Sequence, residues 1–114
     1  MMNGFKALGK DMKALFGDGM EYEMNRNYTM DKDYIIPNKH GYHFFDNLRD
    51  ILYLFGNIDY DIYEIEANDY IEKIENSNYI GKYVTNNIKV VRKLSEEEID
   101  KYIDNNSDEL LKTE

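Results

Sequence analysis

The 114-residue chain contains no cysteine, which excludes disulfide bonds, thiolate nucleophiles and zinc sites built on cysteine. It also lacks an apolar run near the roughly 20 residues that span a bilayer, so we expect no membrane-spanning helix. Charged side chains at Lys6, Lys10 and Asp11 interrupt the stretch in which a secretory signal peptide needs apolar residues. These absences predict a protein that stays in the cytoplasm.

Basic residues are scarce, with 14 Lys and Arg against 23 Asp and Glu and a net charge of -9. Because nucleic-acid affinity comes largely from basic side chains that neutralise phosphates, direct binding to nucleic acid is not expected. The acidic excess is not uniform. Residues 1–50 have a net charge of -1, whereas residues 57–78 and residues 95–114 each have -6, and the stretch 79–94 between them has +4.

Proline and glycine are few, and they are concentrated in the first half of the chain. Pro37 is the only proline, and Gly81 is the only glycine after residue 60. Since both residues mark turns, the first half is expected to be rich in loops. A turn is predicted at residues 17–19, and the alternation of apolar and acidic residues over 20–24 predicts a half-buried strand.

Helical patterns are found in two places. Residues 46–55 carry apolar side chains at the spacing of one helical face, with an aspartate as the expected N-cap. Gly56 is expected to end this helix in a left-handed conformation. Ser95 and Glu98 match a capping box, which predicts a second helix near the C-terminus.

Strand patterns complete the predicted fold. Residues 5–8 form a short piece that is apolar except for Lys6 and predict a first strand. Residues 60–67 alternate acids with inward Tyr63, Ile65 and Ala67 and predict another. Residues 79–94 predict one or two further strands with a turn near Asn86, and the adjacent Val90 and Val91 favour a bulge.

The predicted architecture is therefore a single α+β domain over residues 1–114. It has a small mixed or antiparallel sheet, one central short helix and a C-terminal helix. The tail, at about residues 105–114, is expected to fray.

The acidic segment that begins at residue 57 is the main candidate for a binding surface. Side chains two apart on a strand project about 6.7 Å apart on the same face, of the same order as the spacing of neighbouring phosphates along a nucleic-acid strand. Such a row would fit a basic groove, and tyrosines beside it offer flat surfaces to arginine. The candidate partner-binding residues are Asp59, Tyr60, Asp61, Tyr63, Glu64, Glu66, Asp69, Tyr70 and Glu72. Two alternatives remain: the acids are solvated faces, or the basic stretch 79–94 neutralises them.

No set of catalytic residues is recognised. His40 and His43 have no third metal ligand at a recognisable spacing, and the few serines are not in a nucleophile-elbow context. Phosphate-binding glycine motifs are absent as well. We therefore expect no metal, no cofactor and no enzymatic activity, although two of the many carboxylates would suffice for acid–base chemistry if they converged.

The most distinctive segment is HGYHFFDNLRDILYLFG at residues 40–56, followed by YEIEA at 63–67 and NNIKVVRKLSEEEI at 86–99. Together they resemble an uncharacterised small domain of bacterial and phage proteins, which has a GFHAC-type segment, a helix, an FEVEA-type strand and a KIKIVRELS-type ending. The resemblance covers most of residues 4–100 and brings no established activity. Phe44 and Phe45 stand where that domain has Ala-Cys, so no role of the cysteine carries over.

More loosely, the glycine–aromatic–histidine stretch, the helix and the short acidic strand are similar to the core of ADP-ribosyltransferase-like folds. In those folds a His and a Tyr bind the nicotinamide end of NAD and a Glu orients it. The likeness implies that His43 and either Glu64 or Glu66 take these roles.

The expected function is that of a small acidic interaction protein encoded by a phage or mobile element. Its expected partner is a basic host protein, such as a CRISPR effector or another nuclease, which it would inhibit in the manner of an anti-CRISPR protein in the host cytoplasm. An NAD-using ADP-ribosyltransferase-like enzyme and a structural accessory domain are the alternatives.

Overall fold

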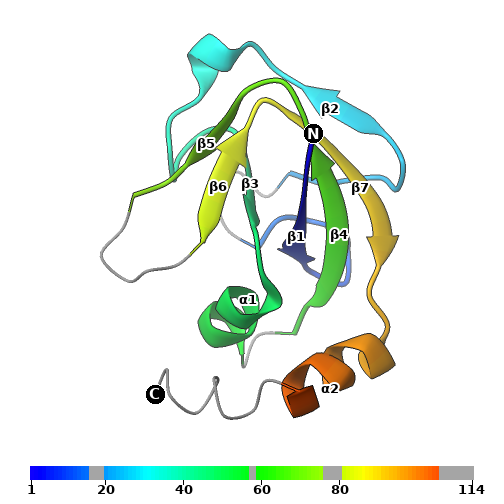
Figure 1. Ribbon diagram of the computed structural model, residues 1–114. Coiled ribbons are helices and arrows are strands. Elements are labelled where there is room, and N and C mark those ends of the chain that lie inside the picture. The colour runs from blue at the N-terminus through cyan, green and yellow to red at the C-terminus, as the bar shows by residue number, and fades with distance from the viewer. Residues whose placement is uncertain (16–19, 57–58, 76–80, 106–114) are drawn as a thin grey trace.

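The computed structural model describes residues 1–15, 20–56, 59–75 and 81–105, and within them the strands form one seven-stranded sheet with the α-helices at one end (Figure 1). The strands are β1 (Met2–Leu8), β2 (Asn27–Thr29), β3 (Tyr42–Phe45), β4 (Asp61–Ala67), β5 (Ile71–Lys73), β6 (Lys82–Thr85) and β7 (Asn87–Lys93). The helices are the 3-10 helix η1 (Lys32–Tyr34), α1 (Leu48–Phe55) and α2 (Glu96–Asn105). Neighbouring strands are antiparallel, and the predicted α+β class is confirmed.

The sheet is strongly curled. Its strand order is β2-β7-β4-β1-β3-β6-β5, so three strands lie between β6 and β7, although Asn86 alone separates them in the chain. In a flat sheet β6 and β7 would lie about 19 Å apart, whereas one residue spans at most about 3.6 Å. The sheet therefore bends until β6 and β7 meet at one end, and the two strands diverge towards the helices (Figure 1).

A hydrogen-bonded corner holds this bend in place. The hydroxyl of Thr85, which is fully buried, lies 2.7 Å from the carbonyl oxygen of Tyr70 and donates to it. The side chain of Asn86 accepts from the Tyr70 amide at 3.0 Å and donates to Asp69 at 2.8 Å. Because every polar group of Asn86 meets a partner, the chain can pass from β6 to β7 through a buried residue without loss of hydrogen bonds.

Two hydrophobic clusters lie on the two faces of the sheet. The first cluster contains Leu8, Tyr22, Tyr42, Phe44, Tyr63, Ile65, Ala67, Ile88 and Val90. The second contains Ala7, Phe45, Leu48, Ile51, Phe55, Ile62 and Leu94, with Ile99 and Tyr102 of α2 packed against it. Successive strand residues such as Phe44 and Phe45 belong to different clusters, as the pleat requires. Helices α1 and α2 therefore cover the second cluster.

The first predicted helix is confirmed and ends at Phe55 as predicted, but the predicted N-cap and the predicted left-handed conformation of Gly56 are wrong. Helix α1 begins at Leu48, and the side chain of Asn47 accepts from the Asp50 amide at 3.0 Å and is therefore the N-cap. Asp46 instead accepts a hydrogen bond from the Asn47 side chain at 2.7 Å. Gly56 has a φ of -41° and is right-handed, so the helix ends there through the low helix propensity of glycine and without a left-handed cap.

Most predicted strands are confirmed. The segment 60–67 corresponds to β4, with Tyr63, Ile65 and Ala67 buried as expected, and the first strand extends back to Met2. The predicted bulge is present: Glu64 lies opposite Arg92 but Ile65 lies opposite Val90, which leaves Val91 as the extra residue.

The second helix also begins as predicted. The Ser95 amide donates to the Glu98 carboxylate and the Glu98 amide donates to the Ser95 hydroxyl, each at 3.1 Å, which confirms the capping box.

The strand predicted over residues 20–24 is wrong. Tyr22 is buried and its neighbours Glu21 and Glu23 are exposed, but Met24, which the alternation places on the inward side, is 41% exposed. Glu21 pairs with Lys13 and Met24 with Val90 through isolated bridges, and no continuous ladder forms. The predicted turn at 17–19 and the tail from residue 106 lie outside the described residues.

Candidate functional site

The outward acids of β4 face basic residues of the neighbouring strand. Glu64 lies opposite Arg92, whose Nε is 2.9 Å from the Glu64 carboxylate, and Glu66 lies opposite Lys89. Both carboxylates are half-buried on the face of the sheet. Opposite charges in directly facing positions of an antiparallel pair attract each other, so β7 compensates much of the charge of β4.

Asp61, at the start of β4, is also compensated. Its carboxylate is 2.7 Å from the Nζ of Lys10 and 3.4 Å from the Nζ of Lys93, and its side chain is 15% exposed. Burial raises the pKa of Asp61, but hydrogen bonds from the two lysines outweigh burial and lower its pKa below the ordinary value. Asp59, in contrast, is 83% exposed and lies 3.8 Å from Lys10.

The candidate tyrosines do not form one exposed row. Tyr63 is 6% exposed and belongs to the first cluster, so a partner cannot reach its ring. Tyr60 is half-buried and packs edge-on against Phe55 with ring centroids 5.8 Å apart, and this burial raises its pKa. Tyr70 donates a hydrogen bond to Glu72 at the surface, and this bond raises the pKa of Tyr70.

Asp69 completes the predicted set at the β6–β7 corner. It has a left-handed φ of 65° and accepts from the side chain of Asn86. The nine predicted residues are therefore divided between the ion-paired strand β4 and the segment before it, the core, the corner and the strand β5, which carries Glu72.

Helix α2 carries a row of acids that the prediction did not single out. Glu96, Asp100 and Asp104 are spaced four residues apart, so they lie along one side of the helix, and all three are exposed. Among the described residues, no ion pair joins any of the three to a Lys or Arg. The capping box at Ser95 predicted the helix. Which side of the helix its acids occupy follows only from Ile99 and Tyr102, the partly buried side chains that pack against the second cluster.

The base of α2 is tied to the sheet by Arg92. The guanidinium contacts the carboxylates of Glu64 and Glu98, each at 2.9 Å. The hydrogen bond from Arg92, together with the backbone amide of Ser95, lowers the pKa of Glu98 to about 2. Arg92 thus links β4, β7 and the first turn of α2 through one side chain.

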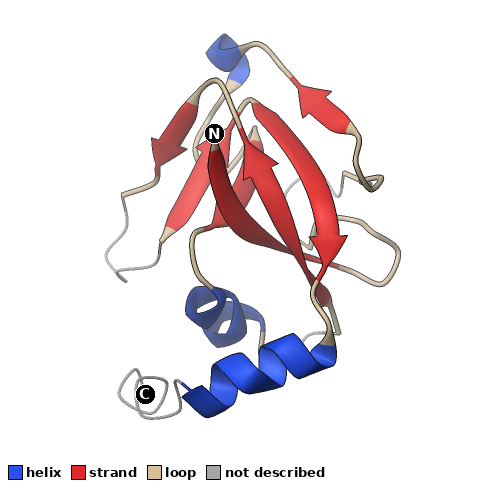
Figure 2. Ribbon diagram, turned by 45° about the vertical axis from the view of Figure 1, so that its right-hand side comes forward, coloured by secondary structure: helices blue, strands red, loops and turns tan. Residues whose placement is uncertain are grey.

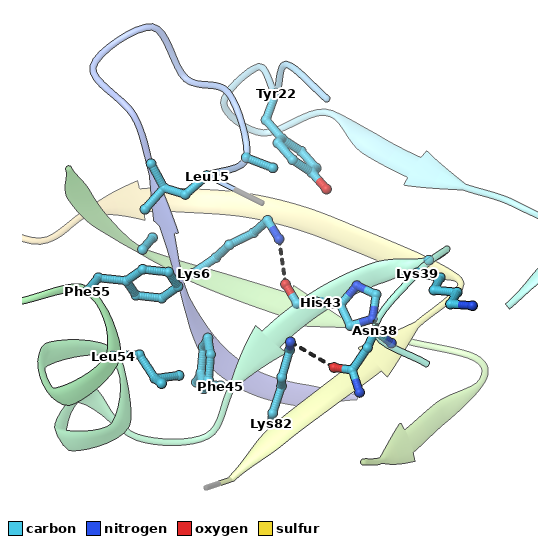
Figure 3. A pocket seen from close by; sticks show the side chains of 13 residues that line it. Lys6, Leu15, Tyr22, Asn38, Lys39, His43, Phe45, Leu54, Phe55 and Lys82 are labelled. Carbon is cyan, nitrogen blue, oxygen red and sulfur yellow. Dashed lines mark hydrogen bonds between the residues drawn. The ribbon is translucent and has the colours of Figure 1, made fainter. Parts of the chain in front are cut away.

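A cavity of about 320 Å³ lies beside the segment 40–56, where β1 and β3 separate. In the described ladder between these strands, Phe5 lies opposite Phe45, and no further residue pair follows. Beyond this pair the ammonium of Lys6 donates to the carbonyl oxygen of His43 at 2.5 Å, so a side chain connects β1 and β3 where the ladder stops (Figure 3).

The cavity has an apolar side and a cationic side. Figure 3 shows Leu15, Phe45, Leu54 and Phe55 gathered on one side. The other side is formed by Lys6, Tyr22, Asn38, Lys39, His43 and Lys82. The ammonium of Lys82 donates to Asn38 at 2.9 Å, and that of Lys6 lies 5.4 Å from the centroid of the Tyr22 ring. Burial lowers the pKa of Lys82.

The two histidines do not assemble a metal site. His40 contacts the carbonyl oxygen of Tyr34 through Nδ1 at 2.7 Å, whereas Nε2 of His43 accepts from the Asn38 amide at 2.9 Å. In the part of the chain that the structure describes, no three His, Asp or Glu side chains gather closely enough to hold a metal ion.

The NAD-binding arrangement implied by the looser likeness is not assembled around the cavity. His43 lines the cavity, but neither Glu64 nor Glu66 does. Strand β1 lies between β3 and β4, and Phe5 stands opposite both Phe45 and Glu64. Glu64 is therefore two strand spacings away from β3, and His43 is two residues along β3 from the position opposite it. At ordinary sheet spacings the Cα atoms of His43 and Glu64 are about 12 Å apart.

The comparison with protein families supports the coarser part of the first resemblance, that the chain is an uncharacterised small domain. The family model of a domain of unknown function, DUF7666, matches residues 2–102. The chain belongs to this family. No curated protein and no solved structure matches it. Within the described residues of this DUF7666 chain, no helix is both long and apolar enough to cross a membrane.

Proposed function

We propose that this DUF7666 chain is a non-enzymatic interaction protein that places an acidic surface in a basic groove of a partner protein. The observation that supports the proposal is the exposed row of Glu96, Asp100 and Asp104 on α2. In contrast to Asp61 and Glu64 on β4, these carboxylates have no ion-pair partner among the described residues. The binding surface proposed is therefore the outer side of α2, which lies at the edge of the molecule (Figure 2).

The spacing of this row suits an array of cationic side chains. Residues four apart on a helix rise about 6 Å, which is again of the order of the spacing between neighbouring phosphates along a nucleic-acid strand. Glu96 lies near enough to Lys10 to help raise the pKa of that lysine, so Lys10 compensates part of the charge at this end of the row, whereas Asp59, which also contacts Lys10, adds a further exposed acid there. Ile103, which is 37% exposed, supplies an apolar contact beside the row.

The partner class that fits this surface is a basic, nucleic-acid-binding host protein such as a CRISPR effector or another nuclease. The chain would occupy the groove that normally receives phosphates, in the manner of an anti-CRISPR protein of a phage or mobile element. Charge complementarity of this kind raises the association rate and makes binding sensitive to salt.

Affinity capture with matched variants tests the proposal. The wild-type chain and the triple variant Glu96→Lys, Asp100→Lys, Asp104→Lys are immobilised and exposed to extracts of bacterial cells. Retained proteins are identified by mass spectrometry and challenged with rising salt and with heparin, a soluble polyanion. We expect basic nucleic-acid-binding proteins on the wild-type chain, their displacement by heparin, and their loss from the triple variant.

A control triple, Glu23→Lys, Asp33→Lys, Glu75→Lys, makes the same change of net charge at other exposed positions and should retain the partner. If the α2 variant and the wild-type chain retain the same basic proteins with the same salt response, the proposal is wrong. Reversal of the β4 acids is a poorer test, because Asp61 and Glu64 have structural ion pairs that the substitutions would also remove.

A further inference from the structure

The cavity between β1 and β3 carries charge of the opposite sign to the rest of the molecule. Its lining includes Lys6, Lys39, Lys82 and His43, and no Asp or Glu is among the described residues that form it. The whole chain has a net charge of -9. Lysines from three separate segments therefore border one concave site in a protein whose net charge is negative.

Two of these cations are held in place by the fold. Lys6 is 8% exposed, and its ammonium is fixed between the carbonyl oxygen of His43 and the ring of Tyr22. Lys82 is half-buried at the start of β6 and donates to Asn38, which is itself held in a left-handed conformation with a φ of 68°. Partial burial strengthens the attraction of these ammonium groups for an anion, because the local dielectric is lower than in water.

The opposite side of the cavity suits an apolar group of a ligand, and the rings of Phe45 and Phe55 favour an aromatic group. Phe45 and Phe55 meet edge to face with centroids 6.1 Å apart and both line the cavity, and Leu54 beside them is 43% exposed. The ring of an aromatic ligand can pack against such a pair in the stacked or edge-to-face arrangement that aromatic groups prefer. The volume of about 320 Å³ equals that of roughly ten water molecules in the liquid, so the ligand is small.

We propose that this cavity binds a small organic anion that has an aromatic body and one carboxylate or sulfonate group. The anionic group lies between Lys6 and Lys82, and the aromatic body lies against Phe45, Phe55 and Leu54. Figure 3 shows that the two sets of side chains face the same space from opposite sides. This site is independent of the acidic surface of α2.

A pair of ligands that differ in charge alone tests the inference. Indole-3-acetate has an aromatic body and a carboxylate, and indole-3-acetamide has almost the same shape without the charge. Binding is followed by amide chemical shifts of the isotopically labelled full chain. We expect indole-3-acetate to bind with a dissociation constant on the order of 0.1 mM, shifting resonances of His43 and Lys82, and the amide to bind at least about tenfold more weakly.

Substitutions at Lys82, which is only half-buried, test the cationic side and leave the buried Lys6 in place. Lys82→Met should weaken binding of indole-3-acetate at least about tenfold, Lys82→Arg should restore it, and Lys89→Met on β7 should have no effect. A circular dichroism spectrum of each variant confirms its fold. Equal affinity for the acetate and the amide, or equal affinity of the Lys82→Met and Lys89→Met variants, would overturn the inference. Absence of binding by indole-3-acetate at millimolar concentration would overturn it as well.

Discussion

Asp50 gives the most direct test of how α1 is attached to the sheet. It is 5% exposed, and one carboxylate oxygen accepts from the amide of Gly81 at 2.7 Å and from the side chain of Asn47 at 3.0 Å. A second oxygen lies 3.6 Å from Arg49. The residue therefore joins the first turn of α1 to the segment that leads into β6.

The change Asp50→Ala should cost at least about 3 kcal/mol of unfolding free energy. Loss of the charged acceptor leaves the buried amide of Gly81 without a partner, at a cost of about 1.5–3 kcal/mol. The lost hydrogen bond from Asn47 adds about 1 kcal/mol, and the lost negative charge in the first helical turn adds about 0.5 kcal/mol. Asp50→Asn keeps an acceptor without the charge and should cost about half as much.

Urea denaturation followed by far-ultraviolet circular dichroism measures these changes. With a denaturant dependence of about 1.5 kcal/mol per molar urea, Asp50→Ala should lower the midpoint by about 2 M. Asp46→Ala is the matched control, because Asp46 is an exposed aspartate near the same helix end, and it should cost less than about 1 kcal/mol. A loss below about 0.5 kcal/mol for Asp50→Ala, or equal losses for both variants, would refute the reasoning.

Three further predictions concern other parts of the fold. Gly41 has a φ of +128°, and an added Cβ would lie 2.5 Å from Val84. Gly41→Ala should therefore lower the unfolding free energy, measured by thermal denaturation, by about 2 kcal/mol or more, whereas Gly9→Ala should lower it far less. Thr85→Val should cost about 1–3 kcal/mol because the buried hydroxyl bonds at the corner are lost, while Thr85→Ser should stay close to wild type, and equal stabilities would contradict this role. The pKa of Glu98 is about 2 in the folded chain and about 4.5 in the unfolded chain, so its contribution to stability is present above pH 4.5 and is lost as the pH falls towards 2. Urea midpoints measured across this range should therefore decline less for Glu98→Gln than for the wild-type chain.

Local patterns in the sequence predicted local structure well. The capping box depends on Ser95 and Glu98, which are three residues apart, and both of its hydrogen bonds are present. The alternation over β4 likewise placed Tyr63 and Ile65 in the core. In each case the interacting groups are neighbours in the chain or share one face of one element, so spacing alone specifies them.

Features that depend on strand register could not be predicted in the same way. The pairing of Glu64 with Arg92 requires the exact register of β4 against β7, including the bulge at Val91. The gathering of Lys6 and Lys82 requires β1 and β6 to lie on either side of β3, which no local pattern encodes. For that reason the segment around His43 was recognised as distinctive while the cavity beside it was missed.

The position of β1 in the sheet has a consequence for synthesis of the chain. Met2–Leu8 leaves the ribosome before both of its partners, β3 and β4, and β4 ends only at Ala67. At about 5–20 residues per second, some 3–12 s pass between the emergence of β1 and that of β4. Throughout this interval β1 cannot pair with β4, the strand with which it forms its longer ladder. Any nascent chain released before β4 is complete lacks the centre of the sheet and exposes a segment that chaperones or proteases would recognise.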